Sequence, residues 1–288
     1  MPSPGAPRRA DLVREATTAL AAAGVAEPRA SAELLWRGAA EESRADLALR
    51  ASETVDARLA ERFADWTRRF AQGEPLAYLE GTCGFYGLEF SVDRRVLVPR
   101  ADSEAVVECA LELLPPGAQG MIADLGTGSG CLLLTLLHER SGLLGLGVDC
   151  SADALTVAHG NARRLGLERR AGFVRGDWWE PVRGPCLLAV ANPPYVVPGE
   201  ELGPGVAEFE PHCALFTPAD DPLHAYRRIL GRARSALARD GTLVFEAGAG
   251  RAGEVAALAI AAGWQPIARH RDLSGIERAL AFRARGDR

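Results

Sequence analysis

A glycine-rich turn between an apolar strand and an apolar helix constrains the fold of this chain most strongly. Residues 121–123 are apolar and lead into the sequence DLGTGSG at 124–130, and an apolar run with helical spacing follows at 131–137. Glycines at alternate positions let the backbone pass close to a ligand, because glycine has no Cβ. The G-x-G-x-G spacing differs from the G-x-G-x-x-G dinucleotide fingerprint. The segment therefore predicts the first strand, loop and helix of a ligand-binding α/β sheet, with a purely structural tight turn as the alternative.

Two further apolar segments end in residues that suit an adenosine ligand. The first ends in Asp149, where a nucleotide-binding sheet places the carboxylate that accepts hydrogen bonds from the ribose hydroxyls. The second leads to Asp177 and Trp178, which we expect to contact the exocyclic amine and the ring of adenine. Either Trp178 or Trp179 can instead be an ordinary core or rim aromatic, and this alternative suits Trp179 better.

The tetrapeptide Asn192-Pro193-Pro194-Tyr195 follows the apolar run 187–191 and suits the methylation of a planar nitrogen. Asn192 offers a side-chain acceptor at the end of a strand. The two prolines stiffen the turn, so that a backbone carbonyl can serve as a second acceptor. Tyr195 offers a flat face for a planar group. An ordinary proline-rich strand exit is the structural alternative.

The order of these strand ends resembles the S-adenosylmethionine-dependent methyltransferases that act on amides and exocyclic amines. Further segments narrow the resemblance to the HemK/PrmC family, whose members methylate the glutamine amide nitrogen in the Gly-Gly-Gln motif of peptide chain release factors. The resemblance covers most of the chain, from about residue 73 to residue 282. The segments that carry it are 73–81, 85–88, 98–104, 209–215, 246–248 and 271–278.

The resemblance implies a Rossmann-like, class I S-adenosylmethionine-dependent methyltransferase sheet, with S-adenosylmethionine as cofactor and S-adenosylhomocysteine as product. It also implies a release factor as protein partner. The chain departs from the family pattern at Cys83-Gly84, Ala101 and Arg251, away from the expected methyl-transfer residues. We expect Asp124, Gly126, Thr127, Gly128, Ser129, Gly130, Asp149, Asp177, Trp178 and Asn192 to bind the cofactor, and Asn192, Pro193, Pro194 and Tyr195 to be catalytic.

The chain is expected to have three parts: an N-terminal helical substrate-recognition domain (1–75), a β-hairpin linker (76–100) and the methyltransferase domain (101–288). Apolar spacing of i, i+3, i+4 predicts the N-terminal helices. Leu35, Trp36 and Trp66 are interpreted as their core. The predicted elements are helices over 11–23, 30–40, 56–70 and from Ser151, a helix after Asp220 that ends at Asp240-Gly241, and strands over 143–148, 171–175, 242–245, 266–268 and 279–282.

Composition excludes some classes of protein. The formal charge of -5 over 288 residues gives no general attraction to nucleic acid, and no apolar run is long enough to span a bilayer. The six cysteines form no C-x-x-C pair, which favours a reduced, cytoplasmic protein. The five histidines show no ligand spacing, so no metal is expected.

Three alternatives remain open on the sequence. A DNA or RNA exocyclic-amine methyltransferase uses a similar tetrapeptide, but it would need a basic cleft and base extrusion. The same chemistry can serve another protein glutamine or a small molecule that bears an amide or amine. A sensor that binds the adenosyl ligand without turnover is the third alternative, against which the intact tetrapeptide argues.

Overall fold

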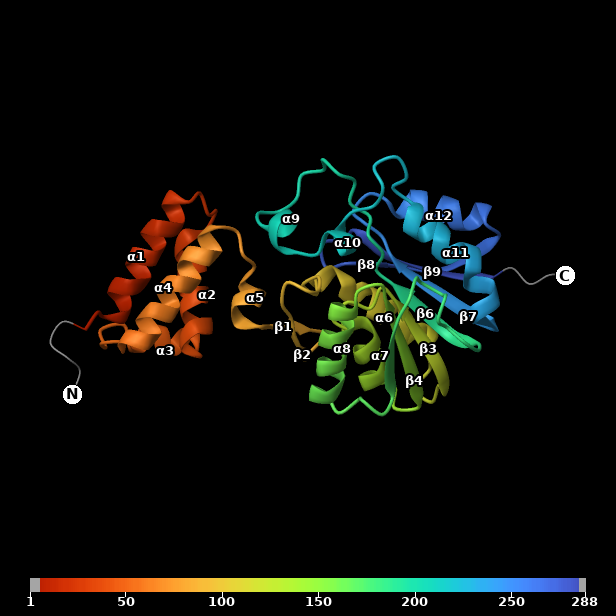
Figure 1. The fold of residues 1–288 in the computed structure, drawn as a ribbon, viewed down its shortest axis with the longest axis horizontal. Helices are drawn as coiled ribbons and strands as arrows, with labels where there is room; N and C mark the ends of the chain where they lie inside the picture. The colour runs from red at the N-terminus through yellow and green to blue at the C-terminus, as the bar shows by residue number, and fades with distance from the viewer. Residues whose placement is uncertain (1–5, 285–288) are drawn as a thin grey trace. The chain divides into compact units, whose positions relative to one another are not determined.

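The computed structural model describes residues 6–284, which form two compact units (Figure 1). The first unit comprises residues 6–81 together with 202–209. The second comprises 82–201 and 210–284. Within these described residues no helix is both long and apolar enough to span a membrane.

The first unit is helical, as the apolar spacing predicts. Leu35 and Trp36 are fully buried, and Trp36 meets Phe63 edge-on with 5.0 Å between ring centroids. Trp66 is partly buried against the same cluster, so the expected core is confirmed. The helices are α1 (Arg9–Ala22), α2 (Pro28–Ala40), α3 (Arg44–Leu49), α4 (Ala57–Ala71), α5 (Leu76–Glu80) and α9 (Val206–Phe209).

A short antiparallel hairpin opens the second unit. Strand β1 (Thr82–Phe85) pairs with β2 (Leu88–Ser91) across a two-residue turn. Tyr86 and Gly87 both have positive φ, 49° and 74°, which is the geometry of a type I′ turn and matches the twist of the strands. A β-hairpin is thus present within residues 76–100, where the sequence predicts one.

A seven-stranded sheet forms the centre of the second unit, in the order β5-β4-β3-β6-β7-β9-β8. The first five of these are parallel, and β9 is antiparallel to both β7 and β8. This is the predicted Rossmann-like arrangement. The strands are β3 (Gly120–Leu125), β4 (Leu143–Asp149), β5 (Ala171–Arg175), β6 (Cys186–Ala191), β7 (Leu237–Glu246), β8 (Trp264–Arg271) and β9 (Glu277–Ala284).

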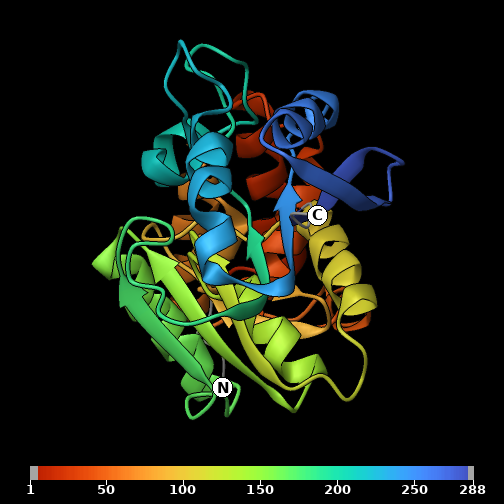
Figure 2. The same ribbon diagram turned by 90° about the vertical axis from the view of Figure 1, so that its right-hand side faces the viewer.

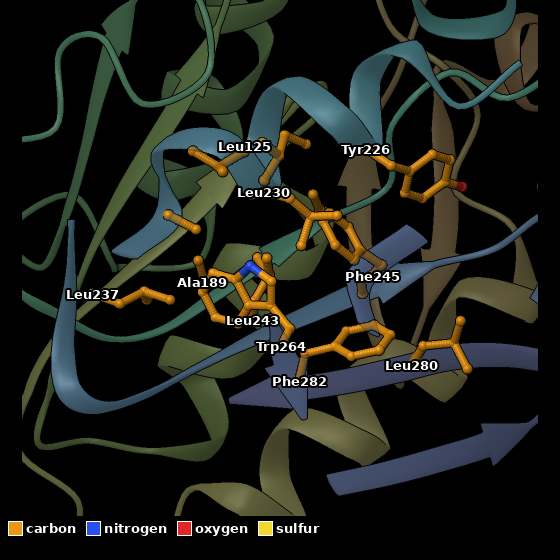
Figure 3. Close-up of a cluster of buried hydrophobic side chains, with 14 of the residues drawn as sticks. Leu125, Ala189, Tyr226, Leu230, Leu237, Leu243, Phe245, Trp264, Leu280 and Phe282 are labelled. Atoms are coloured by element: carbon orange, nitrogen blue, oxygen red, sulfur yellow. The ribbon is translucent and has the colours of Figure 1, made fainter. Parts of the chain in front are cut away.

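Helices cover both faces of this sheet (Figure 2). One buried cluster lies under α11 (His224–Ala236) and α12 (Ala252–Ala261) and includes Tyr226, Phe245 and Trp264, which Figure 3 shows together with Phe282. The other buried cluster includes apolar residues of the two helices at Glu104–Leu113 and Cys131–Glu139. The helical segments of this unit are η1 (Ala101–Ser103), α6 (Glu104–Leu113), α7 (Cys131–Glu139), α8 (Ala152–Arg164), α10 (His212–Leu215), α11 (His224–Ala236) and α12 (Ala252–Ala261).

The topology places the carboxyl ends of the parallel strands at one edge. Successive strands run outward from β3 in one direction through β4 to β5, and in the other direction through β6 to β7. Ligands of open α/β sheets bind at such a switch point, outside the carboxyl ends of the strands. The end of β3 is the glycine loop, so the fold puts this loop at the expected ligand crevice.

The predicted end of the helix after Asp220 is wrong. Helix α11 ends at Ala236, and β7 begins at Leu237, so Gly241 lies inside a strand. The β6–β7 register shifts between Cys186 and Leu188, which accommodates the extra residues of β7. A Cβ on Gly241 would lie 2.9 Å from the Cys186 carbonyl oxygen, so Gly241 permits close strand contact and does not cap a helix.

Candidate active site

The glycine loop has the backbone geometry that its sequence predicts. Gly126 and Gly128 have φ of 79° and 54°, in the left-handed region that favours glycine. The backbone N–H groups of Gly126 and Thr127 both donate to the Val148 carbonyl, at 2.8 and 3.0 Å, which ties the loop to the end of β4. Gly130, also with positive φ, is the N-cap residue of α7. The loop is therefore fixed at the carboxyl ends of β3 and β4, where α7 begins.

Asp124 supports this loop from beneath. Its side chain is buried, and Oδ2 accepts a 2.6 Å hydrogen bond from the Thr127 hydroxyl. Burial raises the pKa of Asp124 to about 7, although the Thr127 bond opposes the rise. Asp124 does not line the cavity described below, so any influence of Asp124 on a ligand there is indirect and passes through Thr127.

Asp149 lies at the end of β4 with both oxygens oriented by backbone N–H groups. Gly128 donates to Oδ2 and Ser151 donates to Oδ1, each at 2.9 Å. Each carboxylate oxygen can accept a further hydrogen bond, so the pair can receive two neighbouring hydroxyl groups. The Ser151 hydroxyl accepts from the Ala154 N–H at 3.1 Å, so Ser151, from which the sequence predicts a helix, is the N-cap of α8.

The segment after β5 separates the two tryptophans. Trp179 is buried and its indole N–H donates to the Ile229 carbonyl at 2.9 Å, so it belongs to the core. Trp178 is only partly buried, has a positive φ of 50°, and lies close enough to Gly126 that a Cβ there would be 3.4 Å from the indole. Asp177 forms an ion pair with Arg228 of α11. An adenine amine would therefore share this carboxylate with a guanidinium.

The Asn-Pro-Pro-Tyr turn directly follows β6. The Asn192 side chain is partly buried, and its Nδ2 donates to the Ser103 hydroxyl at 3.4 Å. The Tyr195 ring packs against Gly248, where a Cβ would lie 2.7 Å from Cδ2. Burial raises the pKa of Tyr195 to about 12, so its hydroxyl stays protonated near neutrality.

A cavity of about 530 Å³ joins these segments, within the usual range for small-ligand sites. It brings together most of the residues predicted from the sequence. Those that line it are Gly126, Thr127, Gly128, Ser129, Asp149, Asp177, Trp178, Asn192 and Pro194. The remaining predicted residues, Asp124, Gly130, Pro193 and Tyr195, are not among the residues that line it.

Other lining residues come from segments to which the sequence reasoning gave no binding role. They include residues from the segments 95–100 and 211–218, together with Ser103, Cys150 and His224. Arg100 forms an ion pair with the buried Glu210, which also accepts from the Val98 N–H at 3.1 Å. The sequence signal for these lining residues is the resemblance to the family at 98–104 and 209–215, because both segments contribute residues to the cavity.

The comparisons with known proteins agree with this geometry. Residues 11–81 match the model described as the PrmC N-terminal domain, and residues 104–208 match the model described as the methyltransferase small domain. A relative from Rhodospirillum rubrum named release factor glutamine methyltransferase is 41% identical over 268 residues, covering 92% of this chain and 82% of the relative. The chain belongs to the release factor glutamine methyltransferase family. It is an S-adenosylmethionine-dependent N-methyltransferase by this membership.

Two further comparisons support the assignment of family and fold. A protein of the same name from Nitratidesulfovibrio vulgaris is 38% identical, with 94% of each chain covered. A solved methyltransferase from Pyrococcus furiosus is 13% identical with a TM-score of 0.52, and the match covers 76% of this chain and 98% of that one. The latter likeness concerns the fold alone. Among residues 6–284 no group of three or more His, Cys, Asp or Glu side chains is arranged to hold a metal ion.

Proposed function

We propose that this protein transfers the methyl group of S-adenosylmethionine to the side-chain amide nitrogen, N5, of the glutamine in a Gly-Gly-Gln motif of a peptide chain release factor. One observation carries the proposal. The tetrapeptide turn reaches the same cavity as the glycine loop and Asp149, in a chain of this family. A cytoplasmic place of action is part of the proposal, as is substrate recognition by the N-terminal helical domain (1–75).

The residues around the cavity fit S-adenosylmethionine. Asp149 presents two oriented carboxylate oxygens to the ribose hydroxyls, and the Gly126–Gly128 backbone leaves room for the chain that bears the sulfonium. Trp178 provides an apolar face beside the loop for adenine. The Asp177 carboxylate, paired with Arg228, keeps lone pairs for the exocyclic amine. The bound cofactor supplies an electrophilic methyl group on a sulfonium.

The protein's own residues act by holding the amide in position for in-line attack. The Asn192 Oδ1 and the Pro193 carbonyl accept the two amide N–H groups, which directs the nitrogen and not the oxygen toward the methyl group. The two prolines stiffen the turn that carries both acceptors. Such positioning of two reactants contributes on the order of 7–11 kcal/mol to the lowering of a barrier. No covalent enzyme intermediate is required.

The proposal is tested by incubating the protein with S-adenosylmethionine and a release factor, followed by tandem mass spectrometry of the Gly-Gly-Gln peptide. We expect one added methyl group on the glutamine side chain. A release factor with glutamate at this position should not react, because a carboxylate offers no N–H to the two acceptors. Cofactor binding without methyl transfer to the release factor would refute this substrate and direct the search to another amide or amine.

The Asn192→Ala variant tests the role of the turn in the same assay. We expect turnover to fall by about a hundredfold or more, because a lost acceptor misplaces the reacting nitrogen. Affinity for S-adenosylhomocysteine should fall far less than turnover, since this variant keeps Asp149 and the glycine loop. Normal turnover in this variant would contradict the assignment.

A further inference from the structure

A buried carboxylate lies directly behind the proposed substrate-binding asparagine. Ala191 of β6 is in register with Phe245 of β7, so the next residues, Asn192 and Glu246, are neighbours at the ends of two parallel strands. Glu246 is 1% exposed, and its Oε2 is buried with no hydrogen-bond partner among the described residues. A buried carboxylate oxygen without a partner is costly for folding. Its position beside the active site therefore calls for a functional explanation.

Ser103 completes this arrangement. It belongs to η1, is buried, and lines the cavity. Its hydroxyl oxygen accepts a hydrogen bond from the Asn192 Nδ2 at 3.4 Å. Burial raises the pKa of Glu246 to about 7, and hydrogen bonds from the Ser103 and Asn192 side chains oppose this rise. The three side chains thus form one polar cluster between the cavity and the core.

The chemistry of this cluster distinguishes the two ends of the asparagine amide. Above a pH of about 7 Glu246 is mainly ionised, and an ionised carboxylate only accepts hydrogen bonds, so it favours the Nδ2 end of Asn192 and disfavours the Oδ1 end. The Ser103 hydroxyl can donate to Glu246 while it accepts from Nδ2. With Nδ2 engaged on this side, Oδ1 is left for the cavity. The opposite orientation of the amide would bring Oδ1 against a carboxylate and present a donor to the substrate.

We propose that Glu246 and Ser103 are positioning residues, which hold the Asn192 amide with its acceptor oxygen toward the substrate nitrogen. The inference rests on the proposed function, because it explains how the tetrapeptide presents an acceptor to an N–H group. The positive charge of Arg278 lowers the pKa of Glu246, but Arg278 forms its ion pairs with Asp102 and Asp272. The carboxylate thereby stays available to the serine and the asparagine.

The orientation of the amide can be tested without any methyl acceptor. The chain contains two asparagines, Asn161 and Asn192, so labelling with ¹⁵N-asparagine gives two side-chain NH₂ signals in NMR spectra. Loss of one signal in Asn192→Ala assigns both. We expect Glu246→Gln and Ser103→Ala each to shift the Asn192 signal. The Asn161 signal is the internal control, because its Nδ2 donates to the carbonyls of Ser91 and Ser129 at 3.0 and 2.9 Å.

The catalytic consequence is tested by steady-state kinetics on the release factor. Glu246→Gln keeps the size of the side chain but adds a donor, so the amide of Asn192 is no longer held in one orientation. We expect kcat to fall about tenfold or more, while KM for the release factor and the Kd for S-adenosylhomocysteine change less than about threefold. Glu139→Gln, the same change at an exposed position of α7, is the matched control and should keep full activity.

The exchange variant Asn192→Asp with Glu246→Gln gives a rescue test. In the single variant Asn192→Asp two carboxylates face each other, and activity should be low. In the double variant the glutamine introduced at position 246 can donate its amide hydrogens to the carboxylate introduced at position 192. One oxygen of that carboxylate then remains as acceptor for the substrate. We expect the double variant to be at least about tenfold more active than Asn192→Asp alone.

These results separate failure of the inference from failure of the proposed function. An Asn192 signal unchanged by both Glu246→Gln and Ser103→Ala would overturn the inference whatever the substrate. A shifted signal with unchanged kcat would overturn the positioning role. A wild-type protein that leaves the release factor unmethylated would instead refute the proposed function, and the NMR result alone would then decide the contact.

Discussion

At the scale of single residues, the site depends on carboxylates that differ in what surrounds them. Asp149 is oriented by two backbone N–H groups and lines the cavity. Asp124 and Glu246 are buried behind it, and burial raises the pKa of each to about 7. In our proposal the partly buried Asp149 binds the ligand, whereas the fully buried Asp124 and Glu246 hold a loop and an amide in place.

The raised pKa of Asp124 predicts a pH dependence of stability. Its folded-state pKa of about 7 lies above the ordinary value of 3.8, so the folded protein binds more protons than the unfolded protein between these values. The free energy of unfolding should therefore fall as pH rises from about 4 to about 7, on the order of 1 kcal/mol per pKa unit. The charge of Asp149 adds to the rise in pKa, while the Thr127 hydroxyl opposes it.

Denaturant unfolding of the wild type and of Asp124→Asn at several pH values measures this contribution. Asparagine does not ionise, and it can still accept the Thr127 hydrogen bond. We expect the difference in unfolding free energy to move in favour of the variant as pH rises from about 4 to about 7, and to level off above that. Parallel pH curves for the two proteins would show that Asp124 is not the titrating group.

At the scale of elements, the backbones of Gly73 and Gly205 lie in close contact within the helical unit. A Cβ on Gly205 would lie 1.7 Å from the Gly73 carbonyl oxygen, and Gly205 has a φ of 76°. Neither the contact nor the conformation tolerates another residue. This contact joins residues 202–209 to the helices of the first unit.

The Gly205→Ala variant should therefore be destabilised by about 1–3 kcal/mol, or should detach the segment 202–209 from its unit. Gly231→Ala on α11 is a matched control, because a Cβ there meets nothing within 4 Å and its φ is not in the left-handed region. Thermal unfolding and limited proteolysis near residue 205 distinguish the two results. Equal stability and equal cleavage in both variants would contradict the observed contact.

At the scale of the whole molecule, apolar periodicity and sequence motifs predict which segments form helices and strands better than they predict which distant segments contact one another. The helices and most strands follow from local apolar spacing, and β5 matches its predicted range of 171–175. The end of α11 was missed, because Asp240-Gly241 resembles a helix end although strand pairing with β6 decides its structure. Ser103 and Glu246 lie in the family-like segments 98–104 and 246–248, but no local pattern shows that their side chains meet, because only the fold brings η1, β6 and β7 together.

A ligand bound in the proposed cofactor site should stabilise the second unit most directly, since every residue that lines the cavity belongs to that unit. S-adenosylhomocysteine at about one hundred times its Kd should raise the free energy of unfolding by about 2.7 kcal/mol, because it binds the folded protein alone. Hydrogen exchange should slow in the glycine loop, around Asp149 and around Trp178. Exchange that slows elsewhere but not in these segments would place the ligand outside this cavity.

Asp149→Ala provides the control for this experiment. The variant loses the two oriented oxygens that we assign to the ribose, and hydrogen bonds to a charged group contribute about 1.5–3 kcal/mol each. The Kd for S-adenosylhomocysteine should therefore rise at least about tenfold, and the protection of the loop should disappear at a ligand concentration that protects the wild type. Asn192→Ala should keep that protection. The two variants together thus separate binding of the cofactor at the end of β4 from handling of the acceptor at the end of β6.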